Sequence, residues 1–115
     1  MIKHREELRH DAIESFRGGK GVTTFIHLLE KEQFHNKGRL FAHHILKAGA
    51  ATGYHKHEAD FEVYYILKGE GTFNDNGQLC PVKEGDIAIT EIGQSHCIEN
   101  TGTEDLEFIG LVLFD

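Results

Sequence analysis

Residues 49–69, GAATGYHKHEADFEVYYILKG, carry two histidines and a carboxylate in a spacing that suits a metal site. His55 and His57 are two residues apart, so on a β-strand both imidazoles point to the same face. Glu62 follows five residues later, far enough for the chain to turn and bring a carboxylate beside them. A third imidazole, His96, comes from a distant segment. Three neutral imidazoles and one carboxylate suit Fe, Mn, Ni, Zn or Cu, so the sequence predicts a divalent transition-metal site.

The glycines around these ligands extend the pattern. Five residues separate Gly49 from the paired histidines, and six residues separate Glu62 from Gly69. A second segment, residues 85–100 with the sequence GDIAITEIGQSHCIEN, places a tight turn just before His96. Together the two segments resemble the first and second motifs of the cupin superfamily. The 15 residues between them are similar to the spacing in small single-domain bacterial cupins, which are often labelled mannose-6-phosphate isomerase-like. One position departs from the family pattern, because Glu91 stands where proline is usual.

The resemblance implies a fold, a ligand set and an assembly. The fold is a double-stranded β-helix, or jelly roll, formed by a single cupin domain over residues 22–115. The metal ligands are His55, His57, Glu62 and His96, and two copies of the chain pair their sheets in a homodimer.

Short strands separated by turns independently predict an all-β fold after residue 22, although this pattern alone leaves an immunoglobulin-like sandwich open. Asn76-Gly77 is a strong hairpin signal, because a type I′ turn needs positive φ at both central residues. Residues 1–21 are expected to form an arm, irregular or partly helical over 1–17. The expected strands cover residues 22–29, 39–47, 52–57, 61–68, 71–75, 78–82, 86–90, 96–100 and 106–114.

Composition narrows the possible partners. The chain has 115 residues and a formal net charge of -7, which argues against nucleic acid as a partner. No apolar run approaches the roughly 20 residues of a membrane span and no leader pattern opens the chain, so we expect no membrane partner and a cytoplasmic protein. The two cysteines, Cys80 and Cys97, are expected to be reduced and structural.

Alternation along the strands selects the side chains that share the interior with the metal. Tyr64 has the parity of Glu62, and His44 has the parity of the apolar residues Leu40, Ala42 and Leu46. We therefore predict that Tyr64 and His44 face inward and are the candidate catalytic groups for proton transfer. The alternative for both is a packed core side chain.

One carboxylate against a divalent ion leaves a site charge near +1, which favours a small anionic ligand with several oxygens. Three functions stay open. The first is a metal-dependent, isomerase-like enzyme on a sugar or keto acid, although Gly53 and Tyr54 stand where phosphomannose isomerases of the family carry glutamine. The second is a dioxygenase or decarboxylase, including the oxalate type. The third is a ligand- or metal-binding module without turnover.

Overall fold

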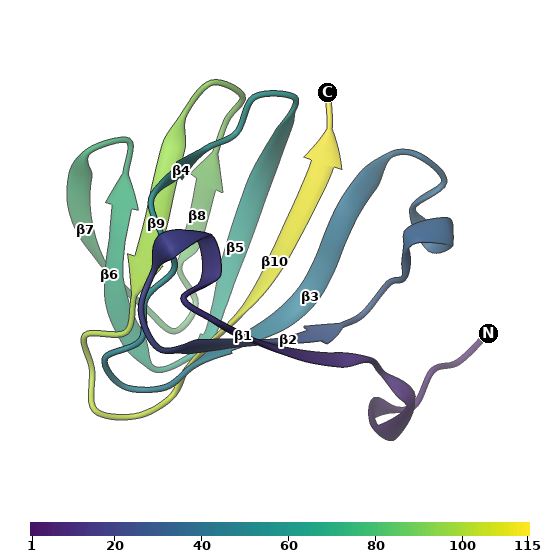
Figure 1. Cartoon of the computed structure of the whole chain (residues 1–115), viewed down its shortest axis with the longest axis horizontal. Coiled ribbons are helices and arrows are strands. Elements are labelled where there is room, and N and C mark those ends of the chain that lie inside the picture. The colour runs from purple at the N-terminus through teal and green to yellow at the C-terminus, as the bar shows by residue number, and fades with distance from the viewer.

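Two antiparallel sheets face each other in the computed structural model, which describes all residues 1–115 (Figure 1). The larger sheet has the strand order β1-β2-β3-β10-β5-β8, and the smaller sheet has the order β4-β9-β6-β7. The all-β prediction is therefore confirmed. The strands are β1 (His10–Glu14), β2 (Val22–His27), β3 (Gly38–Leu46), β4 (His55–Lys56), β5 (Asp60–Lys68), β6 (Glu70–Asp75), β7 (Gln78–Lys83), β8 (Ile87–Thr90), β9 (Ser95–Glu99) and β10 (Leu106–Phe114).

The interior of this sandwich follows from alternation along the strands. On β5, Glu62, Tyr64 and Ile66 are buried, whereas Tyr65 between them is exposed. The same period of two places one face of each strand in the core, where apolar burial stabilises the contact between the sheets. The core cluster consists of Leu46, Ala50, Tyr64, Ile66, Phe73, Ile98, Leu106 and Phe108.

The predicted hairpin between β6 and β7 is confirmed. Asn76 and Gly77 have φ angles of 53° and 101°, as a type I′ turn requires. Pro81 lies on β7, which is the edge strand of the smaller sheet. A proline is tolerated there because an edge strand can lack one amide donor.

The N-terminal arm is more ordered than its sequence suggested. Short 3₁₀ turns at Arg5–Glu7 (η1) and Phe16–Gly18 (η2) match the partly helical expectation. Between them, however, residues 10–14 form β1, which pairs with β2 and extends the larger sheet. The prediction of an arm without strands is therefore wrong. Strand pairing with β2 satisfies the backbone of this segment, although its sequence HDAIE has little strand propensity of its own.

One predicted strand is shorter than expected. Of residues 52–57, only His55–Lys56 form a strand, β4. Just before this range, Ala51 forms isolated β-bridges to Lys20 and to Glu99. The segment before the first histidine is thus held between the arm and β9. None of the helical segments has the length and hydropathy that a membrane span requires.

Candidate metal centre

The four predicted ligands come together inside the sandwich. β4 supplies His55, the turn after it supplies His57, β5 supplies Glu62 and β9 supplies His96. Their candidate donor atoms all lie within 4.8 Å of one another. His55 and His96 are direct partners across β4 and β9, so strand register itself brings two of the imidazoles together.

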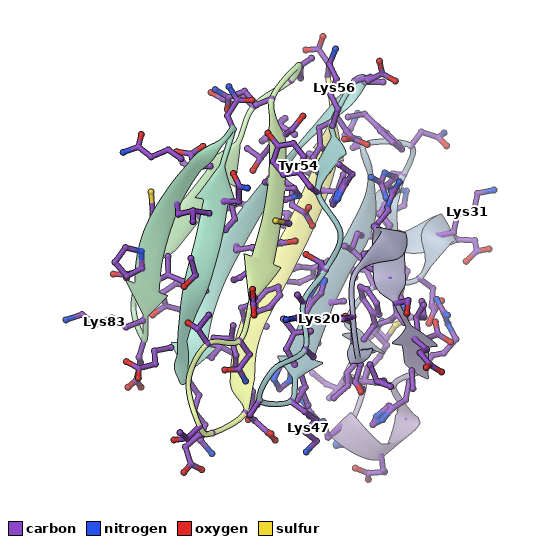
Figure 2. The ribbon with its side chains drawn as sticks, turned by 60° about the vertical axis from the view of Figure 1, so that its left-hand side comes forward. Lys20, Lys31, Lys47, Tyr54, Lys56 and Lys83 are labelled. Carbon is purple, nitrogen blue, oxygen red and sulfur yellow. The ribbon has the colours of Figure 1, made fainter.

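The segment that carries His55 turns its neighbours outward. Figure 2 shows Tyr54 and Lys56 as labelled side chains on this segment, and both are exposed. This is the alternation that the sequence predicted for the histidine pair.

The spacing of the donor atoms fits a metal ion. His96 Nε2 lies 3.0 Å from His57 Nε2, 3.3 Å from His55 Nε2 and 3.1 Å from Glu62 Oε1. His57 Nε2 lies 3.2 Å from the same carboxylate oxygen. Metal–ligand bonds of about 2.1 Å put adjacent donors of an octahedral ion about 3.0 Å apart. The observed distances match that separation.

The other ring nitrogen of each histidine has its own partner. His55 Nδ1 donates to the Gly53 carbonyl at 2.8 Å, and His57 Nδ1 donates to Asp60 Oδ1 at 2.5 Å. His96 Nδ1 lies 2.8 Å from Thr90 Oγ1. Such outer partners orient metal-binding imidazoles and fix which nitrogen carries the proton.

These bonds leave lone pairs facing one another. With their protons on Nδ1, neutral His55 and His57 present Nε2 lone pairs toward His96 and the carboxylate of Glu62. Buried acceptors that face only acceptors are unfavourable, and a cation between them removes the conflict. The residues present therefore fit a divalent metal ion, which would act there as a Lewis acid.

The electrostatics of the cluster favour an ionised carboxylate. Burial raises the pKa of Glu62, but the adjacent His57 and His96 imidazoles outweigh it and hold this pKa at about 2. The Glu62 carboxylate in turn raises the pKa of His57, and burial lowers the pKa of His55. Glu62 is therefore the anionic member of the ligand set at neutral pH.

His44 lies inside as predicted, in an aromatic environment. Its ring stacks on Phe108 at 4.6 Å between centroids and meets the edge of Phe25 at 4.6 Å. Its Nδ1 donates to the Ala42 carbonyl at 3.1 Å. Burial lowers the pKa of His44 to about 4, so the ring is neutral at pH 7. Gly110 makes room for it, because a Cβ there would lie 2.5 Å from the imidazole.

Tyr64 also faces inward. Its ring stacks near His96, with centroids 5.3 Å apart, and packs against Phe108. Burial and the Glu62 charge raise the pKa of Tyr64 well above its ordinary value, so its hydroxyl stays protonated. His44 and Tyr64 both line the small pocket beside the metal donors. Their catalytic role stays a prediction.

The pocket contains residues that the sequence did not reveal. Arg17 from the arm and Arg39 from β3 line it together with the metal donors. Asp60 accepts the hydrogen bond from His57 Nδ1. It also accepts a hydrogen bond from Arg39 Nε at 2.8 Å. An aspartate three residues after a ligand histidine is a usable signal for such an outer partner. The sequence gives no comparable signal for Arg17, because Arg17 is far from the ligands along the chain and no local pattern predicts that it lies beside them.

Sequence comparison supports this assignment independently of the geometry. The family model described as "Cupin domain" matches residues 42–114, which include all four candidate ligands. The chain is a cupin. Its two facing antiparallel sheets are the double-stranded β-helix that the motifs predicted.

This cupin is similar to a protein and to a solved structure from Thermotoga maritima. A protein named "Oxalate-binding protein" is 50% identical over 113 residues, covering 98% of this chain and 93% of the relative. A crystal structure described as a predicted oxalate decarboxylase superposes with a TM-score of 0.95 at 50% identity, covering 100% of both chains. A polyketide cyclase from Streptomyces resistomycificus reaches a TM-score of 0.79 at 20% identity, with 100% of this chain and 81% of the cyclase covered. That likeness shows the fold alone.

Proposed function

We propose that this cupin binds a small dicarboxylate of the oxalate type at a divalent metal held by His55, His57, Glu62 and His96. The arrangement of the four donor atoms is the observation that carries the proposal. A chelating ligand would need two free positions on the ion, and four protein donors would leave that number on a six-coordinate ion.

The donor distances favour a chelating ligand. His96 Nε2 has adjacent-donor spacing to each of the other three ligands, 3.0, 3.3 and 3.1 Å. Four protein donors would leave two positions of a six-coordinate ion for a ligand. Two oxygens of a single small ligand, one from each carboxylate of oxalate, fit such a pair.

The charge of the site and the relatives support the same ligand class. A divalent ion and Glu62 leave a net charge of about +1, which attracts an anion. A Thermotoga maritima relative is named for oxalate binding, and a crystal structure from the same organism, also at 50% identity, is described as a predicted oxalate decarboxylase. Neither name supports sugar isomerisation, so we rank the isomerase-like alternative below dicarboxylate binding.

Decarboxylation is a second candidate, favoured by protonated groups beside the donors. Converting hydrogen oxalate to CO₂ and formate breaks the C–C bond and delivers one proton to carbon. Tyr64 retains its hydroxyl proton, and neutral His44 carries a proton on Nδ1 that is directed at a backbone carbonyl. The Tyr64 hydroxyl is therefore our candidate proton donor, because the Nδ1 proton of His44 is already engaged.

Titration calorimetry of oxalate into the metal-loaded protein tests the proposal. We expect binding that disappears after chelation of the metal and returns when the metal is restored. Acetate, which has one carboxylate, should bind more weakly. The absence of heat with metal-loaded protein would contradict the proposal. Assaying formate in the same samples separates the two candidates: release that Tyr64→Phe abolishes while metal content is kept identifies a decarboxylase.

We further propose that the chain forms a homodimer through the outer face of the larger sheet. Tyr65, Ile87 and Ile89 are 45%, 57% and 51% exposed. Tyr65 pairs directly with Ile87 across β5 and β8, so the exposed apolar residues are contiguous. A second copy of the same face would cover them. Light scattering at micromolar concentration should give twice the chain mass of 13.0 kDa, and Ile87→Lys should shift the mass to that of the monomer.

A further inference from the structure

Two arginines line the pocket beside the metal donors, and their surroundings differ. Arg39 is already engaged, because its Nε donates to Asp60 and forms an ion pair with it at 2.8 Å. Arg17 makes no side-chain hydrogen bond or ion pair in the structure and lies only over the ring of Phe16, with 5.8 Å between its guanidinium carbon and the ring centroid. Arg17 is therefore the free cation at the mouth of the pocket.

The backbone of Arg17 is held firmly against the segment that carries the first histidine. The Gly53 N–H donates to the Phe16 carbonyl at 2.9 Å, and Lys20 and Ala51 exchange two backbone hydrogen bonds. The Gly53 carbonyl accepts a hydrogen bond from His55 Nδ1. A single residue, Gly53, thus connects the arm to a metal ligand, and it fixes where the Arg17 side chain begins.

The conformation of Arg17 is itself unusual. Its φ is 57°, in the left-handed region that side-chain-bearing residues seldom adopt. A non-glycine residue held there costs on the order of 1 kcal/mol, and such strain gathers at functional sites. A glycine would be relaxed at this position, yet the chain carries an arginine.

Arg17 also lies at the entrance. A second groove on the surface adjoins the metal pocket, because the two share Phe16, Arg17, Phe25, Arg39 and Leu40. A ligand that enters through the groove passes Arg17 before it reaches the metal donors. An exposed cation at this point attracts anions and orients them.

We propose that Arg17 is the anion-recognition residue of this site and that its guanidinium binds a carboxylate of the dicarboxylate held at the metal. The proposal rests on the function proposed above and names the residue that selects a dianion. The metal and Glu62 leave about +1, Arg17 brings the site to about +2, and the Arg39–Asp60 pair adds nothing. That charge balances a dicarboxylate and overcompensates a monocarboxylate.

Calorimetry on variants loaded with the metal that the purified wild-type protein carries tests Arg17. Arg17→Ala should weaken oxalate binding about tenfold at 50 mM salt, less at 0.5 M salt, and should leave acetate binding and metal content nearly unchanged. Arg17→Lys should retain part of the affinity, because lysine keeps the charge but not the two-pronged geometry. Lys20→Ala is the matched control: Lys20 lies on the same arm, is exposed (Figure 2) and pairs with Glu99 at 3.1 Å, so its loss should leave oxalate binding unchanged.

A second variant separates recognition from folding. Arg17→Gly should lose oxalate affinity as Arg17→Ala does, while its melting temperature equals or exceeds that of the wild type, because glycine accepts a positive φ. Unchanged oxalate affinity in both variants, with the wild type binding normally, would overturn the role of Arg17 alone. A wild-type protein that binds metal but no oxalate would overturn the proposed function and the role of Arg17 together.

Discussion

The metal donors and the arm that covers them are held in place by different interactions. The donors lie on or beside strands of the two sheets, and their outer nitrogens bind Gly53, Asp60 and Thr90. The arm is fixed by backbone hydrogen bonds to residues 51–53 and by close approaches that only glycine permits. The donor cluster therefore depends on side-chain chemistry, whereas the arm depends on backbone clearance. Substitutions can disturb one region while the other stays intact.

Removing one imidazole should have the largest effect and should act on the donor cluster alone. His57→Ala deletes a donor that lies 3.0 Å from His96 Nε2 and 3.2 Å from Glu62, and it should cost most of the bound metal. Elemental analysis of the purified variant measures this. His27→Ala is the control, because His27 pairs with Asp11 outside the cluster and its loss should leave the metal in place. Full occupancy in His57→Ala would contradict the ligand assignment.

The pH dependence of stability should reveal the buried histidine that is not a ligand, His44. The pKa of His44 is about 4 in the folded protein and 6.5 in the unfolded chain. Between these values the unfolded chain binds a proton that the folded protein does not, so the contribution of His44 to stability falls by about 3 kcal/mol as pH decreases from 6.5 to 4. Glu62, with a pKa of about 2, adds its own loss only below about pH 4.5.

Denaturant unfolding of the metal-free protein at several pH values measures this contribution of His44 to stability. In His44→Phe, which keeps an aromatic ring between Phe25 and Phe108, the loss of stability between pH 6.5 and 4 should be smaller by that amount. The metal is removed first because its own binding depends on pH. Parallel curves for the wild type and the variant would show that His44 is not held neutral by burial.

These two regions also differ in how far the sequence predicts them. The ligand set is local in each motif: His55, His57 and Glu62 lie within eight residues, and strand parity places His44 and Tyr64 inside. Arg17 could not be found in this way. Its position depends on contacts with Gly53, 36 residues away, and its left-handed φ has no signature in a single sequence. Likewise, β1 forms because β2 offers it a pairing edge.

A smaller effect is expected where the arm meets the sheet. A Cβ at Gly53 would lie 1.7 Å from the carbonyl oxygen of Arg17, so Gly53→Ala must push the arm away from the pocket. Such overpacking costs about 1–3 kcal/mol, and we expect weaker oxalate binding with the metal retained.

Gly77→Ala is the control, because it strains a positive φ of 101° in a distant hairpin without meeting any neighbour. It should lower the melting temperature and leave oxalate binding unchanged. Equal oxalate affinity in the two variants would indicate that the arm does not shape the pocket.

The smallest effect is expected at Glu91, where the family motif has proline. Sequence reasoning alone predicts that Glu91→Pro raises the melting temperature slightly, because proline restricts the unfolded chain by about 0.4–1 kcal/mol. In the structure, however, the Glu91 N–H donates to Gln94 Oε1 at 3.0 Å, and proline removes that donor. The lost hydrogen bond, exposed to solvent, costs about 0.5–1 kcal/mol and offsets the gain. We therefore expect a change in unfolding free energy within about 0.5 kcal/mol of zero and unchanged metal content.

In a Gln94→Ala background the hydrogen bond is already absent, so the same proline should stabilise the protein. A stabilisation of equal size in both backgrounds would show that the Gln94 contact contributes nothing to this turn.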